Sequence, residues 1–280
     1  MRSINLTLEE DGADLTSRAV FSPEHRSEVI LVTKQDSLVA GLPLVPIVMK
    51  EAEKYESGPW SWEALVDEGS FVKNGTVMAS ISGPTRLLLK AERIILNFIS
   101  HMSGVANLTS SYVKALEGSA TQLLDTRKTL PGLRYPQKYA VLVGGGRNHR
   151  FSLEDMLMLK DNHIDAAGSI AGAVELLRSS YSPCPPIEVE CRNEAEVLQA
   201  VTARVDRIML DNMDAPAIRK AMALIPPSIE TEVSGGVNLD TIAELVRVEP
   251  GSGVRGPDFI SVGRLTHSAQ VADFSIRFKS

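Results

Sequence analysis

The sequence predicts an α/β fold in two parts, an N-terminal α+β domain packed on an open, incomplete α/β barrel of parallel strands. Two observations predict this arrangement. From about residue 105, short apolar segments alternate with amphipathic ones, a rhythm typical of parallel strands joined by helical crossovers. Before that point, strand and helix patterns follow no regular alternation. We therefore expect an N-terminal domain over residues 1–104 and a barrel domain over 105–267, with segment 268–280 packing back on the first domain.

The first hundred residues carry the patterns of an α+β unit. Asn74-Gly75 is a strong turn pair between alternating runs and predicts a hairpin. The stretch RLLLKAERIILNFISHM places Leu88, Ile95, Ile99 and Met102 at helical spacing. The expected elements are strands at 29–34 and 37–41, a helix from about 44 to 55, the hairpin within 64–83, and a long helix over 86–102.

The second part of the chain contains six apolar segments that predict parallel strands. They are TQLLDT, MLMLKD, IEVEC, RIMLDN, IETEVS and DFISVG. Asn193 and Asn238 stand where helix N-caps are favoured, and Pro216 suits the first turn of a helix. Because a full barrel has eight strands, six strands indicate an incomplete one. A doubly wound open sheet is the structural alternative.

The overall composition excludes several classes of protein. The net charge of -6 argues against a partner that is nucleic acid or a membrane surface. The two cysteines, Cys184 and Cys191, form no CxxC pair and predict neither a disulfide framework nor a zinc site. The first residues lack the apolar core of a signal peptide, and no apolar run reaches the length of a membrane span. We therefore expect a cytoplasmic protein.

Against this acidic background, one segment is strongly cationic. The stretch GGGRNHR occupies residues 144–150, and the whole segment 126–150 contains no carboxylate. Its cations are Arg127, Lys128, Arg134, Lys138, Arg147 and Arg150. A local excess of positive charge in an acidic chain predicts a small anionic ligand.

Chemically active residues also follow the expected strands of the barrel. The strand ends carry Arg127 and Lys128, Lys160, Glu190, Asp211, Ser234-Gly235-Gly236, and Gly263, in chain order. The carboxyl ends of parallel strands meet at the face of a barrel where active sites lie. We therefore expect these residues to form one site. Any one of them alone is more often a solvated side chain or a local ion pair.

The expected site combines three kinds of chemistry. Arg127, Lys128, Arg150 and Lys160, with His149, suit carboxylates or phosphates through charge-assisted hydrogen bonds. Glu190 and Asp211 suit Mg²⁺, which prefers one or two carboxylates together with substrate phosphates. The glycine turns at Gly235 and Gly263 suit a phosphate held by backbone N–H groups. This combination favours phosphoribosyl transfer to an anionic acceptor.

Glu188 shares a strand face with Glu190, and one of the two could instead pair with a nearby arginine. The remaining histidines have no distinguishing context and are expected to be structural: His25, His101, His163 and His267.

Long motifs in this chain resemble the quinolinate phosphoribosyltransferase family, the carboxylating nicotinate-nucleotide pyrophosphorylases. The motifs are DTRKTLPGLRYPQKYAVLVGGGRNHR, LKDNHI, IEVEC, IMLDNM, EVSGGV and SVGRLTHS, with EEDGADLT, LVAG and AERIILNFISHMSGVA in the first part. The resemblance spans nearly the whole chain. It implies that quinolinate and 5-phosphoribosyl-1-pyrophosphate react, with Mg²⁺, to nicotinate mononucleotide, pyrophosphate and CO2 in de novo NAD biosynthesis.

The resemblance also implies a fold of the type II phosphoribosyltransferases, a homodimer or larger oligomer with shared active sites, and residue roles. Arg127, His149, Arg150 and Lys160 would hold the two quinolinate carboxylates beside Lys128, and Arg93 would enter the partner subunit's site. Glu190 and Asp211 would face the ribose and the Mg²⁺-pyrophosphate, whereas Ser234, Gly235 and Gly263 would meet the 5'-phosphate. The catalytic residues would be Lys128, Glu190 and Asp211, and the proton that replaces CO2 would come from Lys128 or a water.

Three residues depart from the family pattern: Lys34, Ser152 and Arg264, the last where a small residue is usual after Gly263. Two alternative functions are a molybdenum-associated phosphoribosyltransferase-like relative and a non-catalytic anion-binding protein on the same fold. The KDNH motif and Asp211-Asn212 count against the first, and the carboxylates of Glu190 and Asp211 count against the second. A transferase specific for nicotinate needs fewer cations.

Overall fold

The structure, a computed structural model, describes residues 1–248 and 253–279. The chain forms two compact units. Unit 1 comprises Met1–Thr109, Leu130–Gly145 and Ser268–Ser280, and unit 2 comprises Ser110–Thr129 and Gly146–His267. The expected domain boundary after residue 104 and the division after Thr109 both fall inside one helix, α4 (Thr85–Ala115).

Unit 1 is built on an antiparallel sheet with the strand order β12-β1-β5-β3. Its strands are β1 (Arg26–Thr33), β3 (Ser61–Ala64), β5 (Val77–Pro84) and β12 (Phe274–Phe278). Strand β12 comes from the end of the chain and pairs along β1. A second, two-stranded sheet joins β2 (Ser37–Leu38) to β4 (Phe71–Val72). The helices besides α4 are α1 (Arg2–Glu10), α2 (Leu15–Val20), α3 (Leu44–Ala52) and α5 (Arg134–Val143).

Helix α4 supplies much of the core of unit 1. The apolar positions expected along it are all buried: Leu88, Ile95, Ile99 and Met102 are at most 4% exposed. The helix runs 31 residues, beyond the expected end at 102, because buried side chains such as Val105 continue the same apolar stripe. Burial of this stripe against the sheet stabilises the helix more than its intrinsic propensity does.

The expected hairpin at Asn74-Gly75 is wrong. A tight turn does form there, with Gly75 at φ 85° and the Thr76 N–H donating to the Lys73 carbonyl at 3.1 Å. However, the flanking strands β4 and β5 belong to different sheets. The Gly75 N–H donates to the carbonyl of Thr33 at 2.8 Å, so the chain leaves the turn along β1. Pairing with this long central strand therefore replaces the local hairpin.

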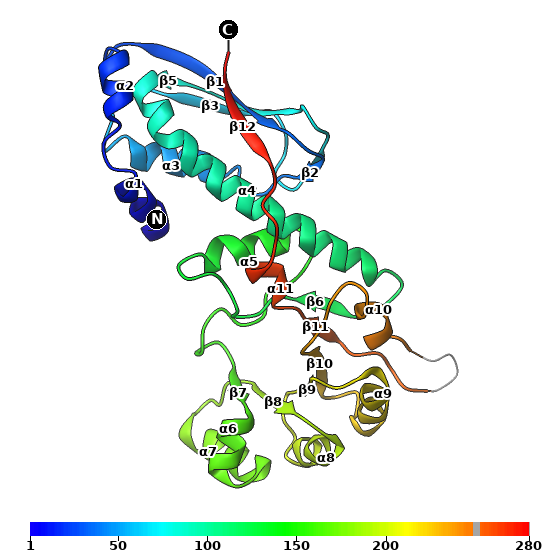
Figure 1. Ribbon diagram of the computed structural model, residues 1–280. Helices are drawn as coiled ribbons and strands as arrows, with labels where there is room; N and C mark the ends of the chain where they lie inside the picture. The colour runs from blue at the N-terminus through cyan, green and yellow to red at the C-terminus, as the bar shows by residue number, and fades with distance from the viewer. Residues whose placement is uncertain (249–252, 280) are drawn as a thin grey trace. The chain divides into compact units, whose positions relative to one another are not determined.

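Unit 2 contains one six-stranded sheet in which every neighbouring pair is parallel, as the sequence predicts. Its strands are β6 (Gln122–Leu124), β7 (Leu157–Leu159), β8 (Ile187–Cys191), β9 (Arg207–Asp211), β10 (Glu230–Ser234) and β11 (Phe259–Ser261). Its helices are α6 (Asp161–Ala167), α7 (Ile170–Ser180), α8 (Glu194–Thr202), α9 (Ala215–Leu224), α10 (Ile242–Leu245) and α11 (Arg264–His267). Figure 1 shows α7, α8 and α9 on the same side of the strands.

The strand order distinguishes a barrel from a doubly wound sheet. In the order β6-β11-β10-β9-β8-β7, the strands from β7 to β11 add one beside the other in chain order, and β6 lies beside β11. A doubly wound sheet reverses direction at its centre, so this order is that of an open barrel. At the β6 edge, Arg147 forms a parallel bridge with Leu124. The cationic segment is therefore attached to the first strand of the barrel.

Local sequence determines most of the helix starts in unit 2. The Asn193 side chain caps α8 by accepting from the Glu196 N–H at 3.0 Å, and Pro216 lies in the first turn of α9. The expected cap at Asn238 is wrong, because α10 begins three residues later, after Thr241. The Asn238 side chain instead accepts from the Asp240 and Thr241 N–H groups and closes a turn before the helix.

Candidate active site

The parallel sheet brings the expected strand-end residues to one edge of unit 2. Because all six strands run in the same direction, their carboxyl ends meet at that edge. The residues placed there are Arg127 and Lys128 after β6, Lys160 after β7, Glu190 on β8, Asp211 on β9, Ser234 and Gly235 at the end of β10, and Gly263 after β11. His149 and Arg150 follow the segment bridged to β6.

Lys160 and Glu190 form an ion pair at this edge, between the ends of adjacent strands. The Lys160 side chain is 44% exposed, whereas that of Glu190 is 17% exposed. Lys160 also stands at the start of α6, where its backbone N–H donates to His163 Nδ1 at 3.1 Å. His163 therefore fixes the turn that carries Lys160, a role that its sequence context did not indicate.

Asp211 and Gly235 meet through Asn212. The Asn212 side chain donates to Asp211 Oδ2 at 2.9 Å, and the Asn212 backbone N–H donates to the Ser234 carbonyl at 2.9 Å. Asn212 itself has φ 53°, and Gly235 has φ 92°. A Cβ at Gly235 would overlap Asn212 Oδ1 and lie 2.8 Å from the Asn212 backbone nitrogen. Only glycine allows the two strand ends to approach this closely.

The Gly263 turn lies against the segment that carries Lys128. A Cβ at Gly263 would lie 3.0 Å from Lys128 Cδ and 3.4 Å from His267 Nε2. The Thr266 hydroxyl donates to both the Lys128 carbonyl at 2.9 Å and the Gly263 carbonyl at 3.1 Å. The aliphatic stem of Lys128 thus runs beside the glycine turn, and His267, which we expected to be structural, lies at the same place.

Arg127 and Arg150 form the cationic side of the edge. Burial lowers the pKa of the Arg150 guanidinium, and the positive charge of Arg127 lowers it further. Arg150 donates to the Met156 carbonyl at 2.8 Å. Arg127 Nε is buried and has no hydrogen-bond partner among the described residues. The charges of Glu188, Glu190 and Asp155 raise the pKa of Arg150 in part, but among the described residues neither guanidinium forms an ion pair within 4.0 Å. Two neighbouring guanidinium groups of this kind are suited to an anionic ligand.

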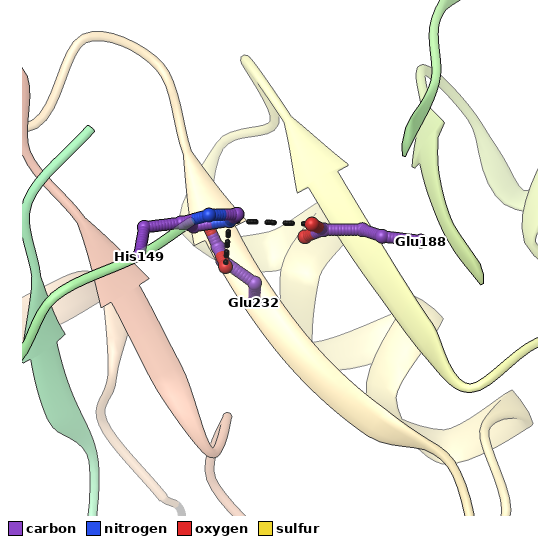
Figure 2. A group of neighbouring side chains, drawn as sticks. All are labelled: His149, Glu188 and Glu232. Carbon is purple, nitrogen blue, oxygen red and sulfur yellow. Dashed lines mark ion pairs between the residues drawn. The ribbon is translucent and has the colours of Figure 1, made fainter. Parts of the chain in front are cut away.

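His149 does not project into solvent at this edge, because its side chain is only 5% exposed and enters the barrel. Its Nε2 lies 3.2 Å from a carboxylate oxygen of Glu188 and 3.2 Å from one of Glu232. Figure 2 shows the imidazole between these carboxylates, which come from β8 and β10. On the other side of the ring, Nδ1 accepts from the Arg150 N–H at 2.7 Å.

The protonation of this cluster follows from its hydrogen bonds. Burial alone would lower the pKa of His149, but the two carboxylates outweigh it and raise that pKa to about 9. Nδ1, however, can accept from Arg150 only while it carries no proton. The geometry therefore favours a neutral ring with its proton on Nε2. Burial raises the pKa of Glu188, whereas His149 and Arg207 hold the pKa of Glu232 below its usual range despite burial.

Sequence reasoning missed three residues that organise this region. The sequence pattern suggests only an arginine partner for Glu188, and it singles out neither Glu232 nor Asp125. All three are 0% exposed. Because residues two apart share a face of a strand, Glu188 lies on the same face as Glu190, and Glu232 lies on the same face as Ser234. This repeat of polar residues on one strand face is the sequence pattern that indicates buried polar groups beneath the site.

Arg93 lies in α4 of unit 1, and its side chain is exposed. Glu92 precedes Arg93 in the sequence and is one possible partner for a local ion pair. Burial raises the pKa of Glu92, and the charge of Arg93 lowers it in part. Within residues 1–248 and 253–279, no ion pair between Arg93 and a carboxylate occurs within 4.0 Å. The local ion pair therefore does not account for Arg93.

The three residues that depart from the family pattern all make contacts of their own. In unit 1, Lys34 Nζ lies 3.7 Å from Asp273 Oδ2. The Ser152 hydroxyl donates to Asp155 Oδ1 at 3.0 Å and helps to close a loop. Arg264 is exposed, and its positive charge partly offsets the burial that raises the pKa of Tyr112. None of these contacts involves a residue expected in the site.

Two groups of residues offer ligands for a metal ion. Glu190 and Asp211 stand at the ends of adjacent strands with hard oxygen donors, a set that fits Mg²⁺ bound partly by substrate phosphates. Among the described residues, one group of three potential ligands occurs, namely His149, Glu188 and Glu232. In that group the histidine already bridges both carboxylates, which accounts for the cluster without an ion.

Comparison with known proteins shows the family of the chain. The sequence profile "Quinolinate phosphoribosyl transferase, N-terminal domain" matches residues 14–103, and the profile of the C-terminal domain matches residues 105–277. The chain belongs to the quinolinate phosphoribosyltransferase family. A curated relative from Bacillus subtilis, "Probable nicotinate-nucleotide pyrophosphorylase [carboxylating]", is 38% identical over 272 residues, covering 96% of this chain and 89% of the relative.

Solved structures of other quinolinate phosphoribosyltransferase relatives share the fold. The crystal structure of NadC from Streptococcus pyogenes has a TM-score of 0.89 and 36% identity, covering 100% of this chain and 96% of that one. The nicotinate-nucleotide pyrophosphorylase from Ehrlichia chaffeensis has a TM-score of 0.89 and 31% identity, covering 99% and 98%. These similarities confirm the predicted fold class. Among the described residues, no helix is both long and apolar enough to span a bilayer.

Proposed function

We propose that this quinolinate phosphoribosyltransferase converts quinolinate and 5-phosphoribosyl-1-pyrophosphate to nicotinate mononucleotide, pyrophosphate and CO2, a reaction of de novo NAD biosynthesis. The observation that carries the proposal is the pairing of full-length family membership with one edge that holds both cations and carboxylates. Such an edge suits a dianionic acceptor beside a polyanionic donor. The enzyme belongs to the transferases, and the cytoplasm remains the expected compartment.

Arg127 and Arg150 are the proposed anchors of the quinolinate carboxylates. Their mutual repulsion and the unpartnered Arg127 Nε leave donors for an incoming carboxylate. Lys160 would bind a quinolinate carboxylate once its ion pair with Glu190 opens. For His149, the buried ring supports an indirect role, in which the histidine orients the neighbouring Arg150 rather than facing the ligand. Bidentate arginine contacts would orient the pyridine ring for transfer.

The glycine turns after β10 and β11 are the proposed site of the 5'-phosphate. Ser234 ends β10 and Gly235 follows it, and Gly263 lies in the turn after β11, which pairs with β10, so the two turns are neighbours. The Ser261 hydroxyl donates to the Ser234 hydroxyl at 3.0 Å and orients it. Backbone amides in such turns bind phosphate without the need for a cationic side chain.

Glu190 and Asp211 are the proposed ligands of Mg²⁺, and both would face the ribose. When bound, the ion would neutralise negative charge that grows on the departing pyrophosphate. The Asn212 side chain holds Asp211 Oδ2, so the carboxylate is oriented before substrate arrives. Negative charge from both residues would also stabilise the positive charge that develops on the ribose as its C1–O bond breaks.

Transfer and decarboxylation then follow in sequence. The quinolinate ring nitrogen forms a bond to ribose C1 as pyrophosphate leaves, which gives the ring a positive charge. The bond to the 2-carboxylate breaks, CO2 departs, and the electron pair remains on the ring carbon beside the positive nitrogen. A proton then adds to that carbon. Lys128 is the proposed donor, directly or through water, because its stem lies beside Gly263 at the same edge.

We further propose a homodimer or higher homo-oligomer in which Arg93 completes the partner's site. The exposure of Arg93 supports this role, as does the finding that it forms no ion pair with a carboxylate of residues 1–248 and 253–279. Helix α5 of unit 1 also exposes an apolar face at helical spacing, where Tyr135 is 76% and Leu142 is 50% exposed, with Tyr139 between them at 39%. An exposed stripe of large apolar side chains suits contact with a second copy of the chain.

Release of labelled CO2 from carboxyl-labelled quinolinate tests the function. We expect release only with both 5-phosphoribosyl-1-pyrophosphate and Mg²⁺, together with nicotinate mononucleotide in equal amount. Nicotinate should be used at least ten- to a hundredfold less well in kcat/KM, because losing one charge-assisted contact costs about 1.5–3 kcal/mol. Comparable use of nicotinate would contradict the assignment of two carboxylate sites. Binding of quinolinate without turnover would favour a non-catalytic anion-binding protein. The absence of both quinolinate binding and turnover would favour a molybdenum-associated relative.

A further inference from the structure

Directly beneath the proposed substrate-binding edge, the barrel interior contains a layer of buried charged residues. Glu188 precedes Glu190 by two residues on β8, and Glu232 precedes Ser234 by two on β10, so each pair shares a strand face. Glu188 and Glu232 are 0% exposed. A barrel interior is usually filled by branched apolar side chains, so two glutamates there need a specific physical reason.

His149 is the residue that makes this layer possible. Its Nε2 lies 3.2 Å from each glutamate, and Arg207 Nη1 lies 3.4 Å from Glu232. Both carboxyl oxygens of Glu188 and Oε1 of Glu232 have no hydrogen-bond partner among the described residues, so Glu188 meets His149 as a charge contact at 3.2 Å. Removing His149 from the barrel would therefore take away the contact that the two buried carboxyl groups share, which is unfavourable. The two glutamates thus hold the imidazole inside the barrel.

The imidazole in turn holds the cationic segment. The His149 backbone N–H donates to Asp125 Oδ1 at 2.9 Å, and the Arg150 N–H donates to His149 Nδ1 at 2.7 Å. Asn148 donates to the other oxygen of Asp125 at 2.6 Å. Three consecutive residues are therefore tied to groups buried in the barrel, and the last of them is Arg150. Its guanidinium can address a ligand reproducibly only if its backbone is fixed.

We propose that Glu188 and Glu232 are positioning residues for quinolinate binding: by anchoring His149 inside the barrel they fix the backbone of Arg150, and with it the guanidinium that meets a substrate carboxylate. The inference rests on the proposed function and extends it to two residues that touch no substrate. Their effect should appear in quinolinate binding, because both side chains contact His149, whose imidazole holds the Arg150 backbone.

Isosteric glutamine variants test the proposal. Glu232→Gln and the double variant Glu188→Gln/Glu232→Gln keep side-chain shape and replace the carboxyl groups that contact His149 Nε2. Glu230→Gln is the matched control, because Glu230 lies on the same strand, is 55% exposed and pairs with Arg207. We expect the quinolinate KM of the double variant to rise about ten- to a hundredfold, the range that a misplacement of about 1 Å can cause. The KM for 5-phosphoribosyl-1-pyrophosphate should change less than about threefold, and the control should resemble wild type.

Two substitutions of His149 separate anchoring from direct contact with substrate. His149→Gln places an amide N–H near the former Nε2 and can still donate to the glutamates, whereas His149→Asn resembles the Nδ1 side and cannot reach them. Anchoring predicts that Gln retains a lower quinolinate KM than Asn. The reverse order, or equal KM values for the two, would overturn the proposal and favour direct contact through Nδ1.

Amide hydrogen exchange at residues 148–150 provides a readout that does not need activity. In wild type the His149 and Arg150 amides should be protected by their hydrogen bonds, and the double variant should lose this protection. If the wild type is active and the double variant keeps both the amide protection and the quinolinate KM, the positioning role is overturned while the proposed function stands. Lost protection in a protein whose wild type does not turn over quinolinate would support the anchoring and overturn the proposed function.

Discussion

The turn after β10 allows a sharp test of whether close approach of two strand ends shapes the phosphate site. Gly235 and Gly236 are adjacent and both have positive φ, at 92° and 63°. An added Cβ at Gly236 meets nothing within 4 Å, whereas at Gly235 it overlaps Asn212 and lies 2.8 Å from its backbone nitrogen. Gly235→Ala and Gly236→Ala therefore share backbone strain but differ in steric contact.

The expected magnitudes follow from these two terms. Alanine at positive φ costs about 1–2 kcal/mol in either variant. Gly235→Ala adds a steric clash of about 1–3 kcal/mol, the usual range for overpacking, because the Asn212 backbone cannot move without losing its 2.9 Å bond to Ser234. The difference in free energy of unfolding between the two variants should therefore be about 1–3 kcal/mol.

Urea denaturation of both variants in parallel would measure this difference, and steady-state kinetics would report its effect on the site. We expect Gly235→Ala to raise the KM for 5-phosphoribosyl-1-pyrophosphate at least about tenfold, and Gly236→Ala to change it little, since only the first displaces the turn. Equal stability and equal KM in the two variants would refute the reasoning, because strain at positive φ alone would then explain both.

Three further predictions concern other parts of the chain. Asp211→Asn should weaken the use of 5-phosphoribosyl-1-pyrophosphate and Mg²⁺ in kinetic titrations while leaving quinolinate binding nearly intact; the opposite pattern would contradict our division of the site. Inactive Arg93→Ala and Lys160→Ala subunits, mixed 1:1 and reassociated, should regain about a quarter of wild-type activity because half the sites in mixed dimers are intact; verified exchange without recovery would place Arg93 in its own chain's site or in a structural role. Because burial raises the pKa of Cys191 to about 12, its thiol should stay protonated and resist iodoacetamide at about pH 8, whereas partly exposed Cys184 should react; equal labelling of the two before unfolding would show that Cys191 is accessible.

Local pattern alone was sufficient for much of the barrel. The alternation of apolar segments with amphipathic ones predicted all six parallel strands, because strand and helix periodicities are properties of neighbouring residues. The rule that carboxyl ends of parallel strands share one edge then predicted that Glu190 and Asp211 would lie on neighbouring strand ends. The long motifs predicted the family, which the comparisons confirm.

Tertiary structure decided what depends on partners distant in the chain. The turn at Asn74-Gly75 was predicted correctly as a turn, but pairing with β1 determined which strands it joins. His149 looked like a ligand-facing cation because its neighbours are Arg147 and Arg150, yet its ring lies inside the barrel. Glu188 and Glu232 come from strands that are far apart in sequence, and only the folded sheet brings both to 3.2 Å from one imidazole. A periodic pattern shows which face of a strand a side chain occupies. The order of the strands in the folded sheet determines which charged residues lie next to that side chain.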